Sequence, residues 1–501
     1  MADEEKNGRP AGSAGETPGS QPGLQQSKGD SRAVARDEDL QPTWTDKDGN
    51  VHRKRILTGD RTTGKLHLGH YVGSLKNRVK LQTQYDTFVL MADVQALTTH
   101  WENPKILKES VREVALDYLA VGIDPYTGGV DDGTRTKIVI QSAVPAIAEL
   151  TCLYGLFTPM SIILDNPTTK AEAQQYGFGA SEENADVVLN EDDRQLYQEL
   201  ASKLHTEFPE LGSELSPSDL VVIVGSLGSS GDVSLVHDLE GHGYADNAVA
   251  AVLHSARALR VVREQLISMK RSAGIRQMNY GFLGYPVSQA ADITFVNAHL
   301  VPVGVDQVPH IELTRDIVQR FNRQYGKRRR ILVEPQALVG KGGTLKGIDG
   351  NAKMSKSLGN AIYLSDSPDE MWQKIKPAPT DPQRVRRDDP GRPEVCNIFS
   401  YHQVFCGGNE AGISEDELGV ATVEEVAVNC RGAKWGCVEC KQQLHRKITA
   451  LTEPMREKRS YWEQHPDDMI DILKLGTQRG IEEGEQTLQR VKDAMSVRYW
   501  D

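Results

Sequence analysis

The stretch TGDRTTGKLHLGHYVG, residues 58–73, decides how the fold is interpreted. From Gly59 to Lys65 it has the pattern G-x-x-x-x-G-K, which is most of a P-loop. The next residue is Leu66, at the position where a P-loop needs a Ser or Thr hydroxyl to bind Mg²⁺. A nucleotide site of the P-loop kind is therefore not expected.

The residues after Lys65 suggest a different phosphate site. His67, Gly69 and His70 lie between a predicted strand, RILTG, and a predicted helix, HYVGSLKNRVKLQ. A helix N-terminus presents unpaired N–H groups to phosphate, and two imidazoles there can donate to its oxygens. Taken alone, the two histidines could equally cap the helix, pack in the core or bind a metal ion.

The chain outside this stretch predicts an α/β fold. Strand-like runs occur at residues 54–59, 87–97, 136–143 and 161–166, and a helical pattern covers residues 102–124. Strands that alternate with helices favour a parallel, Rossmann-like sheet with ligands at the carboxyl ends of the strands.

Composition divides the 501 residues into several parts. Residues 1–48 are rich in Gly, Pro, Ser, Gln and Glu and are predicted to be a disordered tail. Residues 49–365 form the predicted catalytic domain, interrupted by an acidic insertion at 173–274, and residues 366–501 form a predicted helical domain. No run suits a membrane span or a secretory signal, so a cytoplasmic location without a membrane partner is expected.

The net charge of −12 does not exclude a nucleic-acid partner. Residues 1–48 contribute −4 and residues 173–274 contribute −9, so the rest of the chain is close to neutral. Residues 430–461 have 8 Lys or Arg against 3 Asp or Glu, and this segment predicts a basic surface.

A second motif, KMSKS at residues 353–357, belongs with the histidine turn. Two lysines and two hydroxyl side chains stand in a loop flanked by Gly347, Gly350 and Gly359. Such a loop can close on a polyphosphate and provide cationic contacts that are strongest in the transition state.

KLHLGH and KMSKS resemble the two signature motifs of class I aminoacyl-tRNA synthetases. YPVSQAADI, residues 285–293, and VPVGVDQVPHIELTRDIVQRFN, residues 301–322, are similar to the bacterial type of tryptophanyl-tRNA synthetase. The resemblance covers about residues 51–172 and 275–501. It implies ATP-dependent activation of L-tryptophan with Mg²⁺, transfer to tRNA(Trp), an anticodon-binding C-terminal domain and a homodimer.

The resemblance also implies which residues bind ATP and promote the reaction. The expected catalytic residues are His67, His70, Lys353, Ser355 and Lys356. The other expected ATP contacts are Arg61, Thr62, Thr63, Gly69, Gly304, Val305, Asp306, Met354 and Ser357. The family carries an acid at the position of Val305, so Asp306 is expected to bind the ribose alone.

Asp292 matches the acid that accepts the indole N–H of tryptophan in the family, and the alternative is an exposed helix-capping acid. The other expected pocket residues are Leu57, Tyr285, Gln289, Val301, Val303 and Gln307. Three positions depart from the common pattern, since Leu57 replaces an aromatic residue, Gln95 a histidine and Gln289 a methionine.

Four cysteines have the spacing of a metal site. Cys406, Cys430, Cys437 and Cys440 give C-x23-C-x6-C-x2-C, which suits an iron–sulfur cluster or Zn²⁺. Some tryptophanyl-tRNA synthetases resemble this with a [4Fe–4S] cluster, which is the expectation here, with Zn²⁺ as the alternative. Cys152 and Cys396 are expected to be ordinary buried thiols.

Three rival functions stay open on the sequence. The first is the related tyrosyl-tRNA synthetase, which shares the fold and the motifs. The second is a small-molecule nucleotidylyltransferase with an H-x-G-H turn. The third is a synthetase-like RNA-binding or regulatory protein without activation chemistry.

Overall fold

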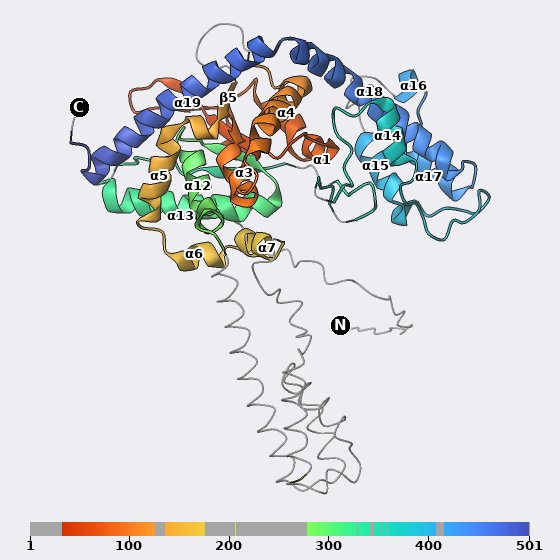
Figure 1. Ribbon diagram of the computed structural model, residues 1–501, viewed down its shortest axis with the longest axis horizontal. Helices are drawn as coiled ribbons and strands as arrows, with labels where there is room; N and C mark the ends of the chain where they lie inside the picture. The colour runs from red at the N-terminus through yellow and green to blue at the C-terminus, as the bar shows by residue number, and fades with distance from the viewer. Residues whose placement is uncertain are drawn as a thin grey trace, which may run out of the picture.

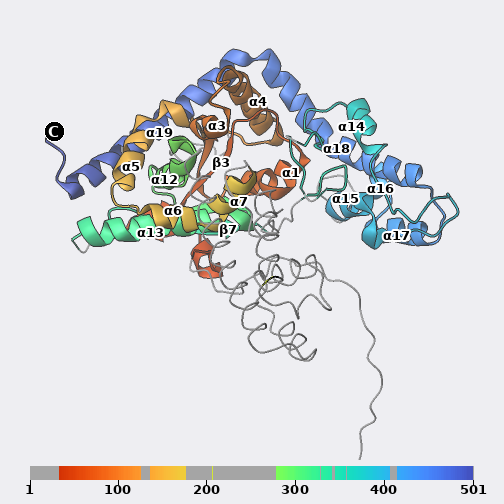
Figure 2. The ribbon, with the colours of Figure 1, turned by 60° about the horizontal axis from the view of Figure 1, so that its bottom comes forward.

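The computed structural model describes residues 33–125, 136–175, 206, 278–327, 329–340, 345–351, 353–356, 358–406 and 415–499. Almost all of the predicted acidic insertion lies outside the described residues, as does Ser357. An α/β body and a group of helices lie side by side (Figure 1; Figure 2). Two long C-terminal helices, α18 (Cys437–Gln464) and α19 (Pro466–Met495), run over both. None of the described helices is long and apolar enough to cross a membrane.

Five parallel strands form the central sheet, in the order β5-β4-β3-β6-β7. Their bounds are β3 Arg55–Arg61, β4 Asp86–Ala92, β5 Lys137–Ile140, β6 Leu300–Val303 and β7 Gln336–Val339. Because all the strands run in the same direction, their carboxyl ends meet at one edge. This confirms the predicted Rossmann-like α/β architecture and places the motifs of residues 58–73 at that edge.

The two faces of the sheet are covered by different helices. In β4, Val89 and Met91 pack into the core with α4 (Lys105–Val121), while Phe88 and Leu90 pack into the opposite core. That second core includes α5 (Pro145–Gly155), α12 (Tyr280–Thr294) and α13 (Val308–Tyr325). The alternation follows from the two-residue period of a strand, and both faces are apolar because both are buried.

Two predicted strand segments differ from the structure. Residues 161–166 were predicted as a strand but lie in helix α6 (Met160–Asp165), followed by α7 (Pro167–Gln175). The second half of the segment 87–97 is helix α3 (Asp93–His100). A short apolar run fits either a buried strand or one turn of a buried helix, and here Pro159 and Asn166 flank a helical turn.

Of the predicted N-terminal tail, the structure describes residues 33–48, and these are ordered. Ala33 is buried, its carbonyl accepts a hydrogen bond from the Ala337 N–H, and the Ala35 N–H donates back to the Ala337 carbonyl. A short hairpin, β1 (Thr43–Thr45) with β2 (Val51–Arg53), follows before β3. The disorder prediction is therefore wrong for residues 33–48, because residues 33–35 pair with the free edge of β7 and residues 43–45 pair with β2.

The opposite edge of the sheet is covered by α19 (Pro466–Met495). A Cβ atom at Gly476 would lie 2.3 Å from the carbonyl oxygen of Ile138, so only glycine allows this approach to β5. Thr477 accepts the backbone N–H of Ile140 through its hydroxyl at 3.1 Å. Gly480 and Gly484 continue the same close-packed stripe.

The remaining C-terminal elements are helical, as predicted. They are α14 (Pro368–Ile375), α15 (Asn397–Phe405), α16 (Glu415–Leu418), α17 (Val423–Arg431) and α18 (Cys437–Gln464). The division of the chain at residue 366 stays a prediction, and α19 packs mainly against the sheet and α5.

Candidate active site

The first element of the site is the end of β3, which a buried ion pair holds. Arg78, itself buried, donates to both carboxylate oxygens of Asp60, at 2.5 and 3.2 Å, and to the Gly59 carbonyl at 3.0 Å. The Tyr118 hydroxyl donates to Asp60 at 2.7 Å. Burial alone would raise the pKa of Asp60, but the Arg78 guanidinium holds it below its usual value.

The histidine turn follows directly. His67 has an extended backbone and precedes helix α1 (Leu68–His70), which continues into a π-helical turn at Tyr71–Leu75 and into α2 (Lys76–Leu81). The His67 N–H donates to Nδ1 of His70 at 3.2 Å, so His70 carries its proton on Nε2. This leaves the Nε2–H of His70 available as a donor.

Both imidazoles are neutral at physiological pH. Burial, aided by the nearby charges of Lys353 and Lys356 and opposed by Asp60, lowers the pKa of His67 to about 2 and that of His70 to about 4. The two rings lie 3.8 Å apart between centroids. A neutral imidazole donates one hydrogen bond, which suits a phosphate oxygen without adding a charge that the buried site would have to stabilise.

The lysine loop lies against this turn. The Leu68 N–H donates to the Ile362 carbonyl at 2.9 Å, and the Leu364 N–H donates to the Leu66 carbonyl at 3.1 Å. The ammonium of Lys356 donates to the carbonyl oxygen of Gly64 at 2.7 Å. Two motifs almost 300 residues apart in the chain therefore meet at one place.

Within the lysine loop, burial affects the charge of Lys356, and hydrogen bonds and packing fix the backbone. Burial lowers the pKa of Lys356 to about 8, although Asp60 and Asp117 oppose this shift. Lys353 is exposed, and Met354 is buried under the turn, close to Gly69. The Ser355 N–H donates to the Asn360 side chain at 2.8 Å.

The base of this loop rests on the C-terminal helices. Asn397, the first residue of α15, donates to the carbonyls of Gly347 and Ile348, at 3.0 and 3.2 Å. Tyr401 donates to the carbonyl of Lys346 at 2.6 Å. The loop is therefore held between the histidine turn and α15.

The predicted ribose-binding segment follows β6. Gly304 leads into a 3₁₀ turn at Val305–Gln307, and a Cβ atom at Gly304 would lie 2.5 Å from a carboxylate oxygen of Asp306. The Thr168 hydroxyl donates to the Asp306 carbonyl at 2.7 Å. Both Val305 and Asp306 are exposed, so the segment is open to a ligand.

Asp292 is buried, which excludes the alternative of an exposed capping acid. Its two carboxylate oxygens accept from the side-chain amides of Gln95 at 2.5 Å and Gln141 at 2.7 Å. Burial raises the pKa of Asp292 to about 7, and the two amides counter this rise. Each oxygen keeps a second lone pair for a ligand N–H.

The other predicted pocket residues lie on α12, β3 and β6 and around the turn that follows β6. Leu57, Tyr285 and Val301 are buried, whereas Gln289, Val303 and Gln307 are half-buried. The Tyr285 hydroxyl lies 3.2 Å from Nε2 of His310, which is also buried.

Several supporting residues were not predicted from the sequence. Asp60, Arg78 and Tyr118 fix the end of β3, while Gln141 completes the amide pair around Asp292. One feature of the sequence could have pointed to such supporting residues, namely a charged residue within an apolar run. An example is Asp117 in VALDYLAV of α4, which is buried. A charge in such a position needs a buried partner.

The predicted metal site is not supported. Among the described residues, no three His, Cys, Asp or Glu side chains lie close enough together to hold a metal ion. Cys406 and Cys440 lie on opposite sides of the His402 ring, each 3.4 Å from one of its nitrogens. With a ring between two of the four thiols, Cys406, Cys430, Cys437 and Cys440 do not form the tetrahedral set that Zn²⁺ or a [4Fe–4S] cluster requires.

The two remaining cysteines also differ from the prediction. Cys152 is exposed on α5, and Cys396 is only half-buried.

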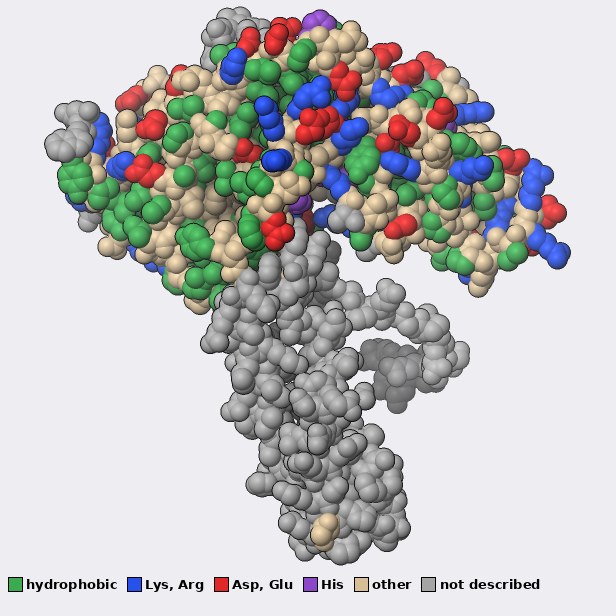
Figure 3. Space-filling model, in the orientation of Figure 1, with side chains coloured by type: hydrophobic (Ala, Val, Ile, Leu, Met, Phe, Trp, Pro, Cys, Tyr) green, Lys and Arg blue, Asp and Glu red, His purple; other side chains and the backbone are tan. Residues whose placement is uncertain are grey.

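The basic segment, residues 430–461, exposes fewer cationic side chains than its composition predicts. Lys441, Lys447 and Arg459 are buried, and Lys441 donates to the carbonyls of Lys376 and Ala378. Arg431, Lys434, Arg446 and Lys458 stay exposed. Lys and Arg side chains also gather at the end of the C-terminal helices that is far from the sheet (Figure 3).

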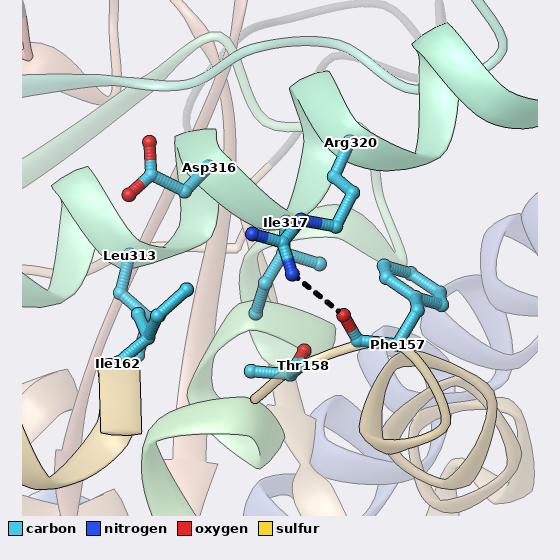
Figure 4. Close-up of a pocket in the computed structure, with 7 residues that line it drawn as sticks. All are labelled: Phe157, Thr158, Ile162, Leu313, Asp316, Ile317 and Arg320. Carbon is cyan, nitrogen blue, oxygen red and sulfur yellow. Dashed lines mark hydrogen bonds between the residues drawn. The ribbon is translucent and has the colours of Figure 1, made fainter. Parts of the chain in front are cut away.

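A small surface cavity lies away from the motifs, between α6 and α13. Arg320 crosses it and donates to the Phe157 carbonyl at 2.9 Å (Figure 4). Its other lining residues are Thr158, Ile162, Leu313, Asp316 and Ile317. It contains none of the predicted site residues.

Comparison with known proteins agrees with this arrangement. Residues 50–194 and 248–453 match the family described as tRNA synthetases class I (W and Y). The tryptophan–tRNA ligase of Aquifex aeolicus is 36% identical over 446 residues, which cover 88% of this chain and 100% of that protein. The ligase of Streptococcus mutans is 36% identical and covers 89% of this chain and 98% of its own.

Solved structures show the same fold. Tryptophanyl-tRNA synthetase from Campylobacter jejuni, complexed with ADP and tryptophan, superposes with a TM-score of 0.57 at 22% identity, covering 88% of this chain and 99% of that one. The enzyme from Mycoplasma pneumoniae gives a TM-score of 0.55 at 20% identity, with 89% and 98% covered. The chain belongs to the class I tRNA synthetases of the tryptophan and tyrosine type, and within them to the tryptophan–tRNA ligases.

Proposed function

We propose that the site joins L-tryptophan to AMP from ATP, releases pyrophosphate, and passes the acyl group to tRNA(Trp). The observation that supports this most directly is the contact of Lys356 with the carbonyl of Gly64, because it unites the histidine turn and the lysine loop. Lys353, Ser355 and Lys356 would neutralise the departing pyrophosphate, while His67 and His70 donate to phosphate oxygens.

This reaction needs no general base from the protein, since the attacking carboxylate of tryptophan is already ionised. Arg61, Thr62, Thr63 and Gly69 would line the phosphate path, and Asp306 would accept from the ribose hydroxyls. Mg²⁺ would be bound by the phosphates of ATP, where it would offset their negative charge. The remaining contribution of the chain is positioning and electrostatics.

Specificity for tryptophan would rest on Asp292. Indole N–H is a donor only, so a buried carboxylate favours it over the phenyl ring of phenylalanine. Tyrosine remains the closest competitor, since the tyrosyl enzymes share the family.

We also propose a homodimer, for which the exposed apolar surface around α5 and α6 is a suitable face. Leu156 is 72% exposed and Met160 is 48% exposed. In the sequence they flank Phe157 and Thr158, which line the cavity of Figure 4. Sedimentation analysis tests this, and a monomer at micromolar concentration would contradict it.

Pyrophosphate exchange tests the activity. We expect exchange that depends on tryptophan and not on tyrosine, followed by charging of tRNA(Trp). Exchange with tyrosine would support the tyrosyl assignment, and exchange without tRNA charging would support a nucleotidylyltransferase. Absence of exchange with either amino acid would support the regulatory alternative.

A further inference from the structure

A buried carboxylate behind the histidine turn is joined to a C-terminal helix. One oxygen of Asp117, on α4, accepts the backbone N–H of Leu66 at 2.6 Å. The other accepts from Arg459, on α18, at 2.6 Å. Asp117 is fully buried and Arg459 is 6% exposed, so both contacts are shielded from water.

Leu66 is the residue next to His67 and is itself completely buried. Its N–H points toward α4, where the Asp117 carboxylate accepts it. A buried N–H without an acceptor is costly, so loss of this contact would favour a different path of the turn.

The same helix also holds the other end of the loop. Tyr118, adjacent to Asp117, donates to Asp60 at the end of β3. Two neighbouring residues of α4 therefore fix the loop of residues 61–66 at both of its ends. The loop carries the predicted phosphate contacts, so a shift of α4 would move them together.

Arg459 is the cation that allows Asp117 to be charged in this place. It also donates to Glu113 at 2.6 Å and to Glu463 at 3.0 Å. Without it, Asp117 and Glu113 would face each other on α4 without this counter-charge in a buried place. Figure 1 shows α18 passing over α4 on the side where α1 lies.

We propose that Asp117 is a positioning residue for ATP, because it fixes the turn that would bind the phosphates. We also propose that Arg459 makes this positioning depend on the packing of α18 against α4. The C-terminal helices thereby hold the phosphate-binding turn from behind, without touching the substrate. The inference rests on the proposed function, because it assigns ATP to the histidine turn.

A second ion pair between a C-terminal helix and the sheet provides a matched control. Glu483 of α19 is 4% exposed and accepts from Arg55 at 2.6 Å. Arg55 is the first residue of β3, so this pair lies at the end of the sheet opposite the site. Glu483→Gln and Asp117→Asn are the same chemical change at comparable burial.

The test compares Asp117→Asn, Arg459→Met, Arg459→Lys and Glu483→Gln in tryptophan-dependent pyrophosphate exchange, with melting temperatures measured alongside. We expect Asp117→Asn and Arg459→Met to lower kcat/KM for ATP by about 10- to 100-fold, while KM for tryptophan stays within about twofold. Arg459→Lys should recover part of the loss. Glu483→Gln should lower the melting temperature and leave both kinetic constants within about twofold.

Equal kinetic effects of Asp117→Asn and Glu483→Gln would overturn the inference, as would wild-type ATP kinetics in folded Asp117→Asn. Calorimetric titration of the same proteins with ATP gives a readout that does not need the chemistry. If the wild type binds ATP but performs no exchange, the proposed function fails. The affinity ratio between Asp117→Asn and Glu483→Gln still decides the inference in that case.

Discussion

The ammonium of Lys356 lies 2.7 Å from the carbonyl oxygen of Gly64, so a residue of the lysine loop is hydrogen-bonded to the segment that leads into the histidine turn. This contact ties the charge of Lys356 to the nucleotide site. The protonation of Lys356 should therefore control the activation of tryptophan with ATP.

Burial lowers the pKa of Lys356 to about 8. The free enzyme would lose this positive charge as the pH rises above that value, so we expect kcat/KM for ATP to fall there. Pyrophosphate exchange measured between about pH 6 and pH 10 checks this. Lys356→Arg keeps its charge throughout and should show lower activity without the fall. An identical inflection in both proteins would contradict the assignment.

Asp292→Asn should separate tryptophan recognition from ATP binding. The change keeps the shape of the side chain but replaces one acceptor oxygen with an amide donor, so kcat/KM for tryptophan should fall by about 10- to 100-fold. KM for ATP should change little. Unchanged tryptophan activation would remove Asp292 from the pocket.

The same variant should alter how stability depends on pH. The pKa of Asp292 rises from 3.8 to about 7 on folding, so the folded state holds its proton more tightly than the unfolded state. Stability from this group is lost as the pH rises from about 4 to about 7. Melting temperatures across this range should vary less in Asp292→Asn than in the wild type, and equal slopes would argue against the raised pKa.

Gly476→Ala should destabilise the protein, because its Cβ would meet the Ile138 carbonyl at 2.3 Å. We expect a loss of about 1–3 kcal/mol in the free energy of unfolding. Gly155→Ala, at the end of α5, meets nothing within 4 Å and serves as the control. It should be neutral or stabilising by up to about 1 kcal/mol, from helix propensity. Similar losses in both variants would show that α19 does not depend on this close approach.

The cysteine arrangement predicts a protein without stoichiometric iron. The ring of His402 lies between Cys406 and Cys440, so Cys406 does not share one centre with the other three predicted ligands. Iron and acid-labile sulfide analysis of anaerobically purified protein checks this. Four iron atoms per chain would mean that the four thiols rearrange around a cluster.

The sequence predicted the meeting of His67 and Lys356, because both lie in short motifs whose chemistry needs a common ligand. It also predicted the parallel sheet, since apolar runs alternate with amphipathic helices. It did not predict that residues 161–166 are helical, because a run of three apolar residues has no distinguishing period.

Contacts between helices that are distant in the chain could not be predicted from the sequence. Arg459 looked like one more cation in a basic segment, but Asp117 and Glu113 draw it into the interior. A count of charged residues does not show which of them face the interior and which face solvent. Partners such as Gln141 for Asp292 likewise depend on the way in which α12 packs beside β5.

Both outer strands of the sheet are already covered, β7 by the paired backbone of residues 33–35 and β5 by the glycine stripe and the Thr477 hydroxyl of α19. Trimming either end would bare a row of N–H and C=O groups to which a second molecule can add a strand. Shortened versions cut before residue 36 or after residue 465 should consequently self-associate and precipitate. We therefore expect the sheet to resist self-association only while residues 33–35 and α19 both stay in place.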